Sequence, residues 1–394
     1  MIEWLFWIAV LVVGYTFAGY GLLLAIVVGV KRLFSFRNQD LESNGDLPKV
    51  CLFVTACNEA DFVAAKVENS FQLNYPKEKL ELLWMTDGST DKTPELLKQY
   101  PGVQIQHLAE RRGKVHAMNR GMKFVKAPIV VFTDSNTLLL SDSLLKLVRH
   151  FADEKVACVA GEKRVVKADQ VNVAAAGENL YWKLESRMKR MESELSSVVG
   201  AAGELFAIRR ELFRPVKEDC LLDDFQISMR MVGDGFRCVY EPEAVAWEKG
   251  SANVREELKR KSRIAAGGLQ SMVRMSFLLN PFRVGWLSWQ YFSHKILRWT
   301  FAPWAILVAF LSNIYLVISN PNDSLELIYI VTFIFQCLWY LFAFVGFKRE
   351  GGGADNKLFY IPYYFTAINY AAIKGLFRFL KGTQSVTWEK AERA

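Results

Sequence analysis

Acidic side chains follow three short apolar runs in this sequence of 394 residues, and they are candidates for chemistry. Asp87 and Asp134 come directly after a run rich in β-branched and aromatic residues, and Glu59 follows such a run after Cys57 and Asn58. Such runs predict β-strands, and in an open α/β sheet ligands bind outside the carboxyl ends of the strands. Each acid alone also fits a turn or a helix cap. Three carboxylates at one edge repel one another unless a cation or a donor-rich ligand lies between them, so we expect a ligand site there.

The chemistry of this edge indicates a divalent cation and phosphate. The candidate ligand atoms are oxygens, which favour a hard ion such as Mg²⁺ or Mn²⁺ with phosphate completing its shell. A nucleoside diphosphate would supply that phosphate. A dinucleotide oxidoreductase and a P-loop nucleotidase are disfavoured, because no G-x-G-x-x-G motif follows the first strand and no G-x-x-x-x-G-K-[ST] motif occurs.

Short β-rich runs alternate with amphipathic stretches, which predicts an α/β domain on a mostly parallel sheet. The expected strands are residues 49–55, 81–86, 103–107 and 129–133, and the expected helices between them are residues 61–72, 93–100 and 114–125. Further strands are expected at residues 156–165, 204–208 and 236–241, with a long helix at residues 172–193. These elements would bring the acids to one edge of the sheet.

Three uncharged segments are long enough to cross a bilayer, whose hydrocarbon core needs about 20 helical residues. They are residues 4–30, 299–319 and 327–347. Lys31 and Arg32 follow the first segment directly, which predicts that its carboxyl end is cytoplasmic and that the amino terminus lies outside. Within this segment Gly21, Ala25 and Gly29 share one helix face, so we expect another helix to approach closely there.

These segments divide the chain into four regions of a multi-pass protein of the cytoplasmic (inner) membrane. Residues 1–31 form an N-terminal anchor, residues 46–248 a cytosolic α/β domain, residues 249–298 basic amphipathic interface helices, and residues 299–394 a C-terminal membrane region with a basic tail. Whether residues 358–377 form a third C-terminal span stays open. Lys348 and Arg349 before it and the basic residues after it argue for the same side of the membrane.

The net charge of +8 does not indicate a nucleic-acid-binding protein. Residues 249–274 contain seven Lys and Arg against two Glu, and residues 348–394 contain eight against four acidic residues. Both basic segments flank apolar ones, so a surface facing anionic lipid is the better explanation. The expected partners therefore include the lipid bilayer and exclude nucleic acid.

Several motifs, in the order found here, resemble family 2 glycosyltransferases, the relatives of bacterial cellulose and hyaluronan synthases. The matching runs of the first half are Ala56-Cys57-Asn58-Glu59, Asp87-Gly88-Ser89-Thr90-Asp91, Gly113-Lys114-x-x-Ala117-x-Asn119-x-Gly121 and Thr133-Asp134-Ser135-Asn136-Thr137. The matching runs of the second half are Gly200-Ala201-Ala202-Gly203, Asp223-Asp224 and Arg260-Lys261-Ser262-Arg263-Ile264. The resemblance covers about residues 48–270 and implies a GT-A fold, the fold of nucleotide-diphospho-sugar transferases.

The resemblance also implies roles for individual residues. Asp224 is the expected catalytic base with Asp223 beside it, and Asp134 is the expected ligand of Mg²⁺ or Mn²⁺ with Asn136 as a second ligand. The expected substrate-binding residues are Glu59, Asp87, Asp91, Lys114, Asn119, Ser135, Arg260 and Arg263. Structural explanations stay open: the acid pair also suits a helix N-terminus, the two arginines a basic helix facing lipid, and Lys114 and Asn119 a solvated helix.

The function implied by this resemblance is an inverting transfer of a hexose or N-acetylhexosamine. The donor would be a nucleotide-diphospho-sugar, with a UDP-sugar expected, and the acceptor a lipid-linked or polysaccharide chain at the cytoplasmic membrane face. Asn136 stands where the family has the second acid of D-x-D, and Ile264 stands where the family has Trp. With three or four spans a single transfer is expected, and processive synthesis of the cellulose or hyaluronan type is the alternative. A non-catalytic membrane partner in polysaccharide assembly is an alternative of another class.

Overall fold

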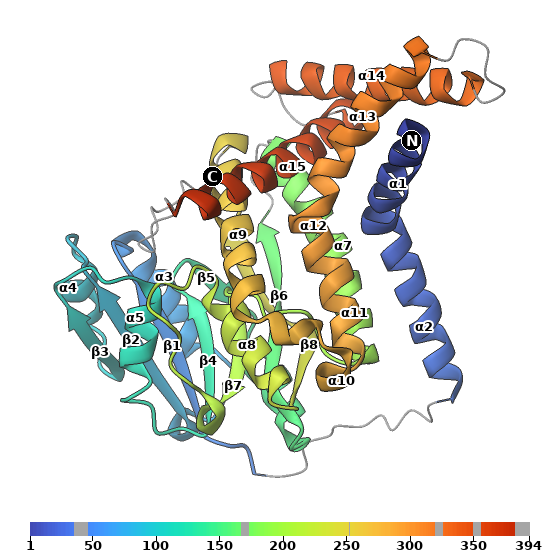
Figure 1. The fold of residues 1–394 in the computed structure, drawn as a ribbon. Coiled ribbons are helices and arrows are strands. Elements are labelled where there is room, and N and C mark those ends of the chain that lie inside the picture. The colour runs from blue at the N-terminus through green and yellow to red at the C-terminus, as the bar shows by residue number, and fades with distance from the viewer. Residues whose placement is uncertain (35–45, 167–172, 252, 320–325, 350–355, 383–394) are drawn as a thin grey trace.

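The protein consists of an α/β domain with long helices along one side (Figure 1). This computed structural model describes residues 1–34, 46–166, 173–251, 253–319, 326–349 and 356–382. The described chain begins with an apolar helix, continues through the α/β domain, and ends with helices that return to the first one.

Within the described residues, one sheet of eight strands forms the centre of the α/β domain. Its strands are β1 (Val50–Ala56), β2 (Leu80–Asp87), β3 (Val103–Leu108), β4 (Ile129–Asp134), β5 (Thr137–Leu139), β6 (Val156–Val166), β7 (Leu205–Arg209) and β8 (Arg237–Lys249). Their order across the sheet is β3-β2-β1-β4-β7-β6-β8-β5. The half from β3 to β4 is parallel, as predicted, whereas β7 runs antiparallel to β4 and β6, and β5 antiparallel to β8. The sheet is therefore mixed.

Helices cover both faces of this sheet, and aromatic packing joins its central strands. The helices of the domain are α3 (Ala60–Phe71), α4 (Thr93–Leu97), α5 (Lys114–Gly121), α6 (Ser143–Val148) and α8 (Asp223–Gly233). Phe53, Phe132 and Phe206 pack in a row across β1, β4 and β7, with ring centroids 5.0 and 4.9 Å apart. A Cβ on Gly121 would lie 2.3 Å from the Phe53 ring, so this glycine lets α5 lie close to the sheet. That close packing holds the end of α5 against β1, and the helix begins at Lys114.

Three helices of the described chain are long and apolar enough to cross a membrane, and they match the three predicted segments. The first is Ile2–Phe34, formed by α1 (Ile2–Gly14), a π-helical turn (Tyr15–Gly19) and α2 (Tyr20–Phe34). The others are α13 (Phe301–Ser319) and most of α14 (Glu326–Lys348). The fourth candidate, α15 (Lys357–Lys381), forms a helix but is not among these three.

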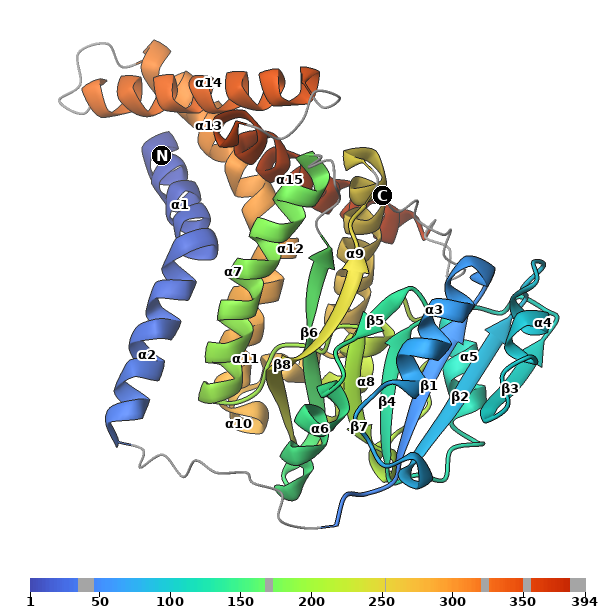
Figure 2. The same cartoon turned by 180° about the vertical axis from the view of Figure 1, so that it is seen from behind.

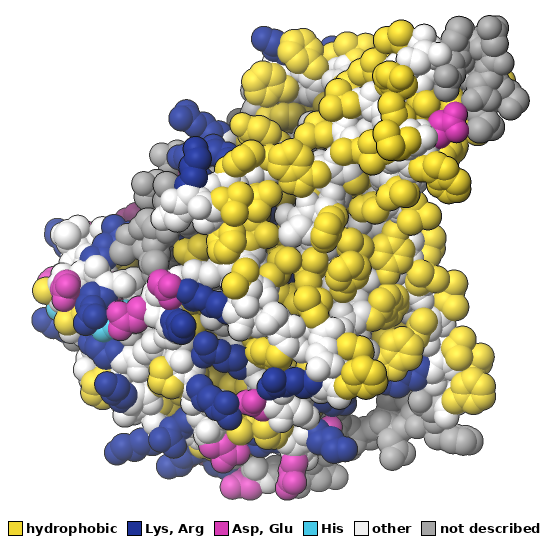
Figure 3. Space-filling model, viewed as in Figure 1, with side chains coloured by type: hydrophobic (Ala, Val, Ile, Leu, Met, Phe, Trp, Pro, Cys, Tyr) yellow, Lys and Arg dark blue, Asp and Glu magenta, His cyan; other side chains and the backbone are white. Residues whose placement is uncertain are grey.

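The remaining helices connect the α/β domain to the apolar ones. They are α7 (Val173–Leu195), α9 (Val254–Arg274), α10 (Pro281–Val284), α11 (Trp286–Tyr291) and α12 (Leu297–Trp299). Both views show α2 running beside α7 and α15 crossing the upper end of α9 (Figures 1 and 2). Figure 3 shows hydrophobic side chains gathered over α1, α2 and α13, while charged side chains cover the α/β domain.

The prediction of a close helix contact at the small residues of the anchor was wrong. A Cβ added to Gly21 or Gly29 would meet no described atom within 4 Å. The buried face of α2 is instead formed by Tyr20, Leu24 and Val28, which pack with residues of α7 such as Leu195. Large side chains fill this interface, because α2 packs against the amphipathic α7 rather than against another small-residue stripe.

Candidate active site

The carboxyl ends of β1, β2 and β4 meet at one edge of the sheet, where the start of α5 bridges two of the predicted acids. Asp87 ends β2, Asp134 ends β4, and Glu59 lies between β1 and α3. Lys114 Nζ donates a hydrogen bond to Asp134 Oδ1 at 2.8 Å. The backbone N–H of Gly113 donates to Asp87 Oδ2 at 2.6 Å. The two acids therefore contact consecutive residues of one loop.

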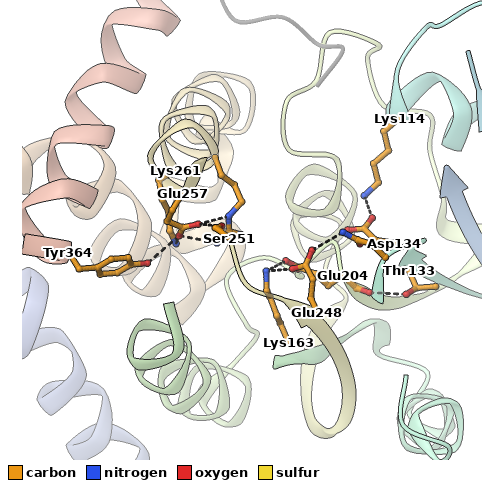
Figure 4. Close-up of polar contacts among 12 residues, drawn as sticks. Lys114, Thr133, Asp134, Lys163, Glu204, Glu248, Ser251, Glu257, Lys261 and Tyr364 are labelled. Atoms are coloured by element: carbon orange, nitrogen blue, oxygen red, sulfur yellow. Dashed lines mark hydrogen bonds and ion pairs between the residues drawn. The ribbon is translucent and has the colours of Figure 1, made fainter. Parts of the chain in front are cut away.

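A second pair of acids reaches the same lysine from α8. Asp223 and Asp224 are the first two residues of this helix, and Lys114 Nζ lies 3.8 Å from Asp223 Oδ2. That oxygen is buried and accepts no hydrogen bond. Figure 4 shows Lys114 extended toward Asp134 across this region. We call Asp134, Asp223 and Asp224 the acid cluster; it joins residues about 90 positions apart in the sequence around one ammonium group.

Asp224 is an acid with a strongly shifted proton affinity. Burial, and then the neighbouring carboxylate of Asp223, raise the pKa of Asp224 to about 7, although the Lys114 charge acts in the opposite direction. Its Oδ1 accepts a hydrogen bond from the Phe225 N–H at 2.8 Å. A Cβ on Gly203 would lie 3.3 Å from its Oδ2, so the glycine keeps the surroundings of that oxygen uncrowded. A carboxyl group with a pKa near neutrality suits proton exchange with a hydroxyl group.

An arginine of α9 adds positive charge near the acid cluster. Burial lowers the pKa of Arg263, and the carboxylates of the acid cluster oppose that fall. Two glycines let α9 approach. A Cβ on Gly267 would lie 2.7 Å from the Leu222 side chain, and a Cβ on Gly268 would lie 2.4 Å from the Trp299 ring. The helix is thus held between the segment before α8 and the helices that lead to the membrane.

Asp87 is held by the loop that precedes α5. Its Oδ2 accepts hydrogen bonds from the backbone N–H groups of Arg112 and Gly113, at 3.0 and 2.6 Å. Gly88 has a φ of 62°, and a Cβ there would lie 2.3 Å from that of Arg111, so only glycine lets the two loops meet. This acid therefore fixes the loop that presents Lys114.

Two of the predicted substrate-binding acids lie where helices begin. Asp91 accepts hydrogen bonds from the backbone N–H groups of Ala60 and Thr93, both at 3.0 Å, and so caps the first turns of α3 and α4. The backbone N–H of Glu59 donates to Thr93 Oγ1 at 2.9 Å. These contacts explain how the loops after β1 and β2 are joined; a role of either acid in substrate binding stays a prediction.

Three more predicted residues have protein partners close to the site. Asn119 exchanges two hydrogen bonds with the backbone of Val216, at 2.7 and 3.0 Å. Arg260 makes a two-pronged ion pair with Glu257 of the same helix, at 2.9 and 3.0 Å. Ser135 is buried directly after Asp134. Asn119 and Arg260 therefore contact protein groups that hold the site in place. Their part in donor binding stays a prediction.

Asn136 leads to a buried ionic cluster that the sequence did not predict. Its amide nitrogen donates to Glu248 Oε1 at 3.3 Å, and both Glu248 and Glu204 pair with Lys163, which lies 2.8 Å from Glu204 Oε1 (Figure 4). Burial alone would raise the pKa of Glu204, but the Lys163 charge holds it well below its usual range. The Glu204 carbonyl also accepts from Thr133 Oγ1 at 3.0 Å. No local signal marked this lysine, because it stands in the charged run Glu162-Lys163-Arg164 of β6.

A second buried lysine supports the same loop from α3. Lys66 Nζ donates to Thr133 Oγ1 at 3.0 Å and to the Thr137 carbonyl at 2.8 Å. Burial lowers the pKa of Lys66 to about 7, while the charge of Asp134 acts to raise it. Its signal in the sequence is its spacing, because Lys66 follows the buried Val63 by three positions on the apolar face of the helix.

The residues present fit a divalent ion that is shared with a bound phosphate. In the described part of the chain, no group of three or more His, Cys, Asp or Glu side chains is arranged to hold a metal ion alone. Mg²⁺ is commonly bound by one or two carboxylates together with substrate phosphates rather than by an all-protein cage. Asp134 at the strand end and the buried Asp223 oxygen without a hydrogen bond supply such carboxylates.

Two sequence relatives each match more than half of the chain. The chain is 26% identical over 260 residues to the beta-monoglucosyldiacylglycerol synthase of a Nostoc species, covering 63% of this chain and 55% of the relative. It is 27% identical over 248 residues to the poly-beta-1,6-N-acetyl-D-glucosamine synthase of Staphylococcus aureus, covering 61% and 60%. The chain thus spans little more than half the length of these relatives.

A solved structure and a family model extend this comparison. The mannosyltransferase PcManGT from Pyrobaculum calidifontis, in complex with GDP-Man and Mn²⁺, superposes with a TM-score of 0.70 over 96% of this chain and 100% of that chain, at 22% identity. This likeness confirms the predicted α/β fold of GT-A type. A family model described as "Glycosyltransferase like family 2" matches residues 48–267. That range exceeds half of the chain, so the protein belongs to the glycosyltransferase family 2.

Proposed function

We propose that the protein moves a sugar, with inversion at the anomeric carbon, from a nucleotide-diphospho-sugar to a lipid-linked or glycan acceptor at the cytoplasmic membrane face. The observation that best supports this is the convergence of the acid cluster on Lys114, with Asp134 at a strand end and Asp224 at a helix start. One end of this arrangement suits a diphosphate and its cation. The other end offers a carboxyl group with a pKa near neutrality.

In this proposal Asp224 acts as the general base. It takes the proton of the acceptor hydroxyl while the hydroxyl oxygen attacks the anomeric carbon and the bond to the donor diphosphate breaks. Lys114 and Arg263 place positive charge around the acid cluster, where the diphosphate develops negative charge as it leaves. Asp134 would bind Mg²⁺ or Mn²⁺, which when bound neutralises part of that charge. Attack opposite the leaving group gives the inverted product.

The proposed donor is a UDP-sugar with a hexose or N-acetylhexosamine, and the proposed acceptor is embedded in or bound to the membrane. Two relatives are named as synthases of a glucosyl lipid and of an N-acetylglucosamine polymer, whereas the solved structure holds GDP-Man. A membrane acceptor is supported by α9, which carries Arg263 and packs against α15 and Trp299. Single transfer is proposed over processive synthesis, because Ile264 replaces the Trp of the processive synthases.

The decisive experiment is a transfer assay with the full-length protein in lipid nanodiscs. Radiolabelled UDP-sugars and GDP-sugars are supplied singly with Mn²⁺ and membrane lipid extract, and products are separated by size. We expect one donor to label one lipid or glycan by a single unit, with loss of transfer in excess EDTA and in Asp224→Asn. The matched control is Asp61→Asn, an exposed acid of α3, which should keep wild-type activity. No transfer from any donor would contradict the proposal, and a long polymer would establish the processive alternative.

A further inference from the structure

A buried glutamate outside the acid cluster joins the N-terminal helix to the α/β domain. Glu192 lies on α7, and its side chain is fully buried. Its Oε1 accepts a hydrogen bond from the Tyr20 hydroxyl at 2.7 Å, and His294 Nδ1 lies 2.6 Å from the same oxygen. Tyr20 belongs to α2, and His294 to the π-helical turn Phe292–Ile296. One carboxylate oxygen therefore joins three separate elements.

The other oxygen of Glu192 holds the loop that borders the acid cluster. The backbone N–H of Val199 donates to Glu192 Oε2 at 3.3 Å. The chain then passes through Gly200, whose φ of 91° favours glycine, and reaches Gly203, where a Cβ would lie 3.3 Å from Asp224 Oδ2. Only three residues thus lie between Val199, which Glu192 holds, and Gly203, which borders the candidate base.

Further hydrogen bonds hold the same loop, so Glu192 is one of several residues that fix its position. The Val198 N–H donates to the Cys238 carbonyl at 2.9 Å, and the Ala201 N–H donates to Ser228 Oγ at 3.1 Å. These contacts attach the loop to β8 and α8 within the α/β domain. Glu192 differs from them because its other oxygen contacts the apolar N-terminal helix.

An ionic cluster fixes the position of Glu192. His294 Nε2 lies 3.1 Å from Glu185 Oε2, so the imidazole is held between Glu185 and Glu192. Burial alone would raise the pKa of Glu185, but the charges of His294, Lys295 and Arg298 hold it well below its usual range. Lys295 and Arg298 lie 2.7 and 3.1 Å from its oxygens. Glu192 is therefore held in a charged, tightly packed region, where a small displacement of one partner is costly.

The position of α2 along α7 determines where the Tyr20 hydroxyl lies. Near the carboxyl end of α2, Lys31 Nζ donates to the Glu194 and Leu195 carbonyls at 2.6 and 2.9 Å, which caps the end of α7. Arg32 makes two hydrogen bonds of 2.6 Å to the Glu194 carboxylate. Figure 2 shows the two helices running side by side. A shift of α2 along α7 would therefore move Tyr20 relative to Glu192.

We propose that Glu192 is a positioning residue that transmits the seating of the N-terminal membrane helix to the loop 199–203, and so sets the wall of the active site at Asp224. The docked helix supplies the Tyr20 hydrogen bond, the bond orients the Glu192 carboxylate, and the carboxylate holds the Val199 N–H. The kinetic part of this inference rests on the proposed function, whereas the loop-ordering part is independent of it.

Two tyrosines of the same helix provide a matched test. Tyr20→Phe removes the hydroxyl that contacts Glu192 and leaves the ring that packs against Trp289. Tyr15→Phe removes a hydroxyl that contacts Ser293 and Trp289 at 2.7 and 2.9 Å in the same interface, without touching Glu192. Both proteins stay full-length and are studied in nanodiscs.

Hydrogen–deuterium exchange of peptides covering residues 196–204 is the first measurement, because it needs no substrate. We expect exchange to be about threefold to tenfold faster in Tyr20→Phe than in the wild type, which is the effect of weakening one buried hydrogen bond. Tyr15→Phe should exchange at the wild-type rate in these peptides. Equal exchange in both variants would overturn the proposal.

Kinetics with the donor found in the transfer assay are the second measurement. Tyr20→Phe and Glu192→Gln should each lower kcat about threefold to tenfold and leave the donor KM within about twofold, because the loop borders the base rather than the nucleotide. The double variant should be no slower than the slower single one, since both changes act through one carboxylate. A loss confined to donor KM or to Tm would overturn the proposal. If the wild type itself transfers no sugar, the proposed function fails, and the exchange measurement still decides the inference.

Discussion

The acid pair at the start of α8 combines the proposed catalytic role with a cost to folding. Two adjacent buried carboxyl groups repel each other when both are ionised, and the pKa of Asp224 is raised to about 7 for this reason and because of burial. The usual pKa of an aspartate in an unfolded chain is about 4. As pH rises from about 4 to about 7, the unfolded chain therefore loses this proton before the folded protein does, and the folded state becomes less stable.

Asp224→Asn is predicted to make the protein more stable and less active. The amide cannot ionise, so the penalty disappears, and we expect the Tm of the variant to exceed that of the wild type by more at pH 8 than at pH 5. Without the base, kcat should fall by about 10²–10⁴-fold while donor affinity stays near the wild-type value. Thermal unfolding at both pH values and donor titration check the two parts. A lower Tm at pH 8 than that of the wild type would show that Asp224 is not a strained carboxylate.

The pH dependence of activity provides a separate prediction for the same residue. Since the base must be ionised in the free enzyme, kcat/KM should fall about tenfold per unit below a pH of about 7. Asp223→Asn removes the neighbouring like charge, which should lower the pKa of Asp224 and move this limb of the profile to lower pH. Asp61→Asn, on the exposed side of α3, should leave the profile in place. A shift to higher pH in Asp223→Asn would contradict the proposed coupling.

Strand ends and the family resemblance predicted which residues gather at the site but not what supports them. Asp134 could be named because it follows a predicted strand, and Lys114 and Asp223 because their motifs resemble those of family 2 glycosyltransferases. The supports depend on pairs that are far apart in sequence. Asn136 and Glu248 are 112 positions apart, and Tyr20 and Glu192 are 172 positions apart. No local pattern in one sequence specifies such pairs, because they result from how the strands and helices pack.

At the scale of elements, local sequence patterns likewise predicted the strands, whereas pairing between distant segments was not predicted. The predicted parallel strands from β1 to β4 were confirmed, because each is a short apolar run between turn residues. The strand predicted at residues 236–241 extends to Lys249 as β8, because its second part pairs with both β6 and β5. The three-residue strand β5 was not predicted, since it is defined only by that pairing. Strand direction after β4 likewise depended on contacts that the sequence does not display.

Contacts of α15 bear on the topology that the sequence left undecided. The Tyr364 hydroxyl donates to Glu257 Oε1 at 3.2 Å in a buried contact (Figure 4). A Cβ on Gly375 would lie 2.7 Å from the Ser262 carbonyl, so α15 packs closely along α9. Because α9 also carries Arg263, a helix bound along it is held on the side of the α/β domain. These contacts favour a helix that lies at the membrane interface over a third C-terminal span.

We therefore predict that the end of α15 and the α/β domain lie on the same side of the membrane. Single accessible cysteines replacing the exposed Lys381 and Asp61, in a background where the partly exposed Cys57 and the exposed Cys337 are serine, should react with a membrane-impermeant maleimide in inside-out vesicles. Neither should react in right-side-out vesicles. Reaction of the Lys381→Cys variant from the opposite side to that of Asp61→Cys would show that α15 crosses the bilayer.

At the scale of the whole molecule, the apolar surface is larger than a simple anchor requires. The first apolar helix has 33 residues and is about 50 Å long, whereas the hydrocarbon core is about 30 Å thick. Its second half packs on α7 and still exposes large apolar side chains, with Leu22 66% and Ile26 61% exposed. Figure 3 shows this surface continuing over the helices that lead to α13. A continuous apolar face of this size is expected to contact lipid, so we infer that the α/β domain itself lies against the bilayer.

The far end of this face provides the last prediction. Phe282 on α10 is 99% exposed and Trp286 on α11 is 55% exposed, and both views place these helices level with the carboxyl end of α2 (Figures 1 and 2). Aromatic side chains at such positions favour the interface of a bilayer. In nanodiscs with brominated lipids, tryptophan fluorescence of the wild type should therefore be quenched more than that of Trp286→Phe.

Trp84→Phe is the matched control for this measurement, because Trp84 is fully buried in β2 and cannot meet lipid. Its loss should leave the quenched share of the signal at least as large as in the wild type. Trp286→Asp, by the same reasoning, should slow transfer to an acceptor embedded in the bilayer and leave donor affinity unchanged, since the acid cluster is not altered. Equal quenching in the wild type and Trp286→Phe would place α11 in water and restrict membrane contact to the three candidate spans.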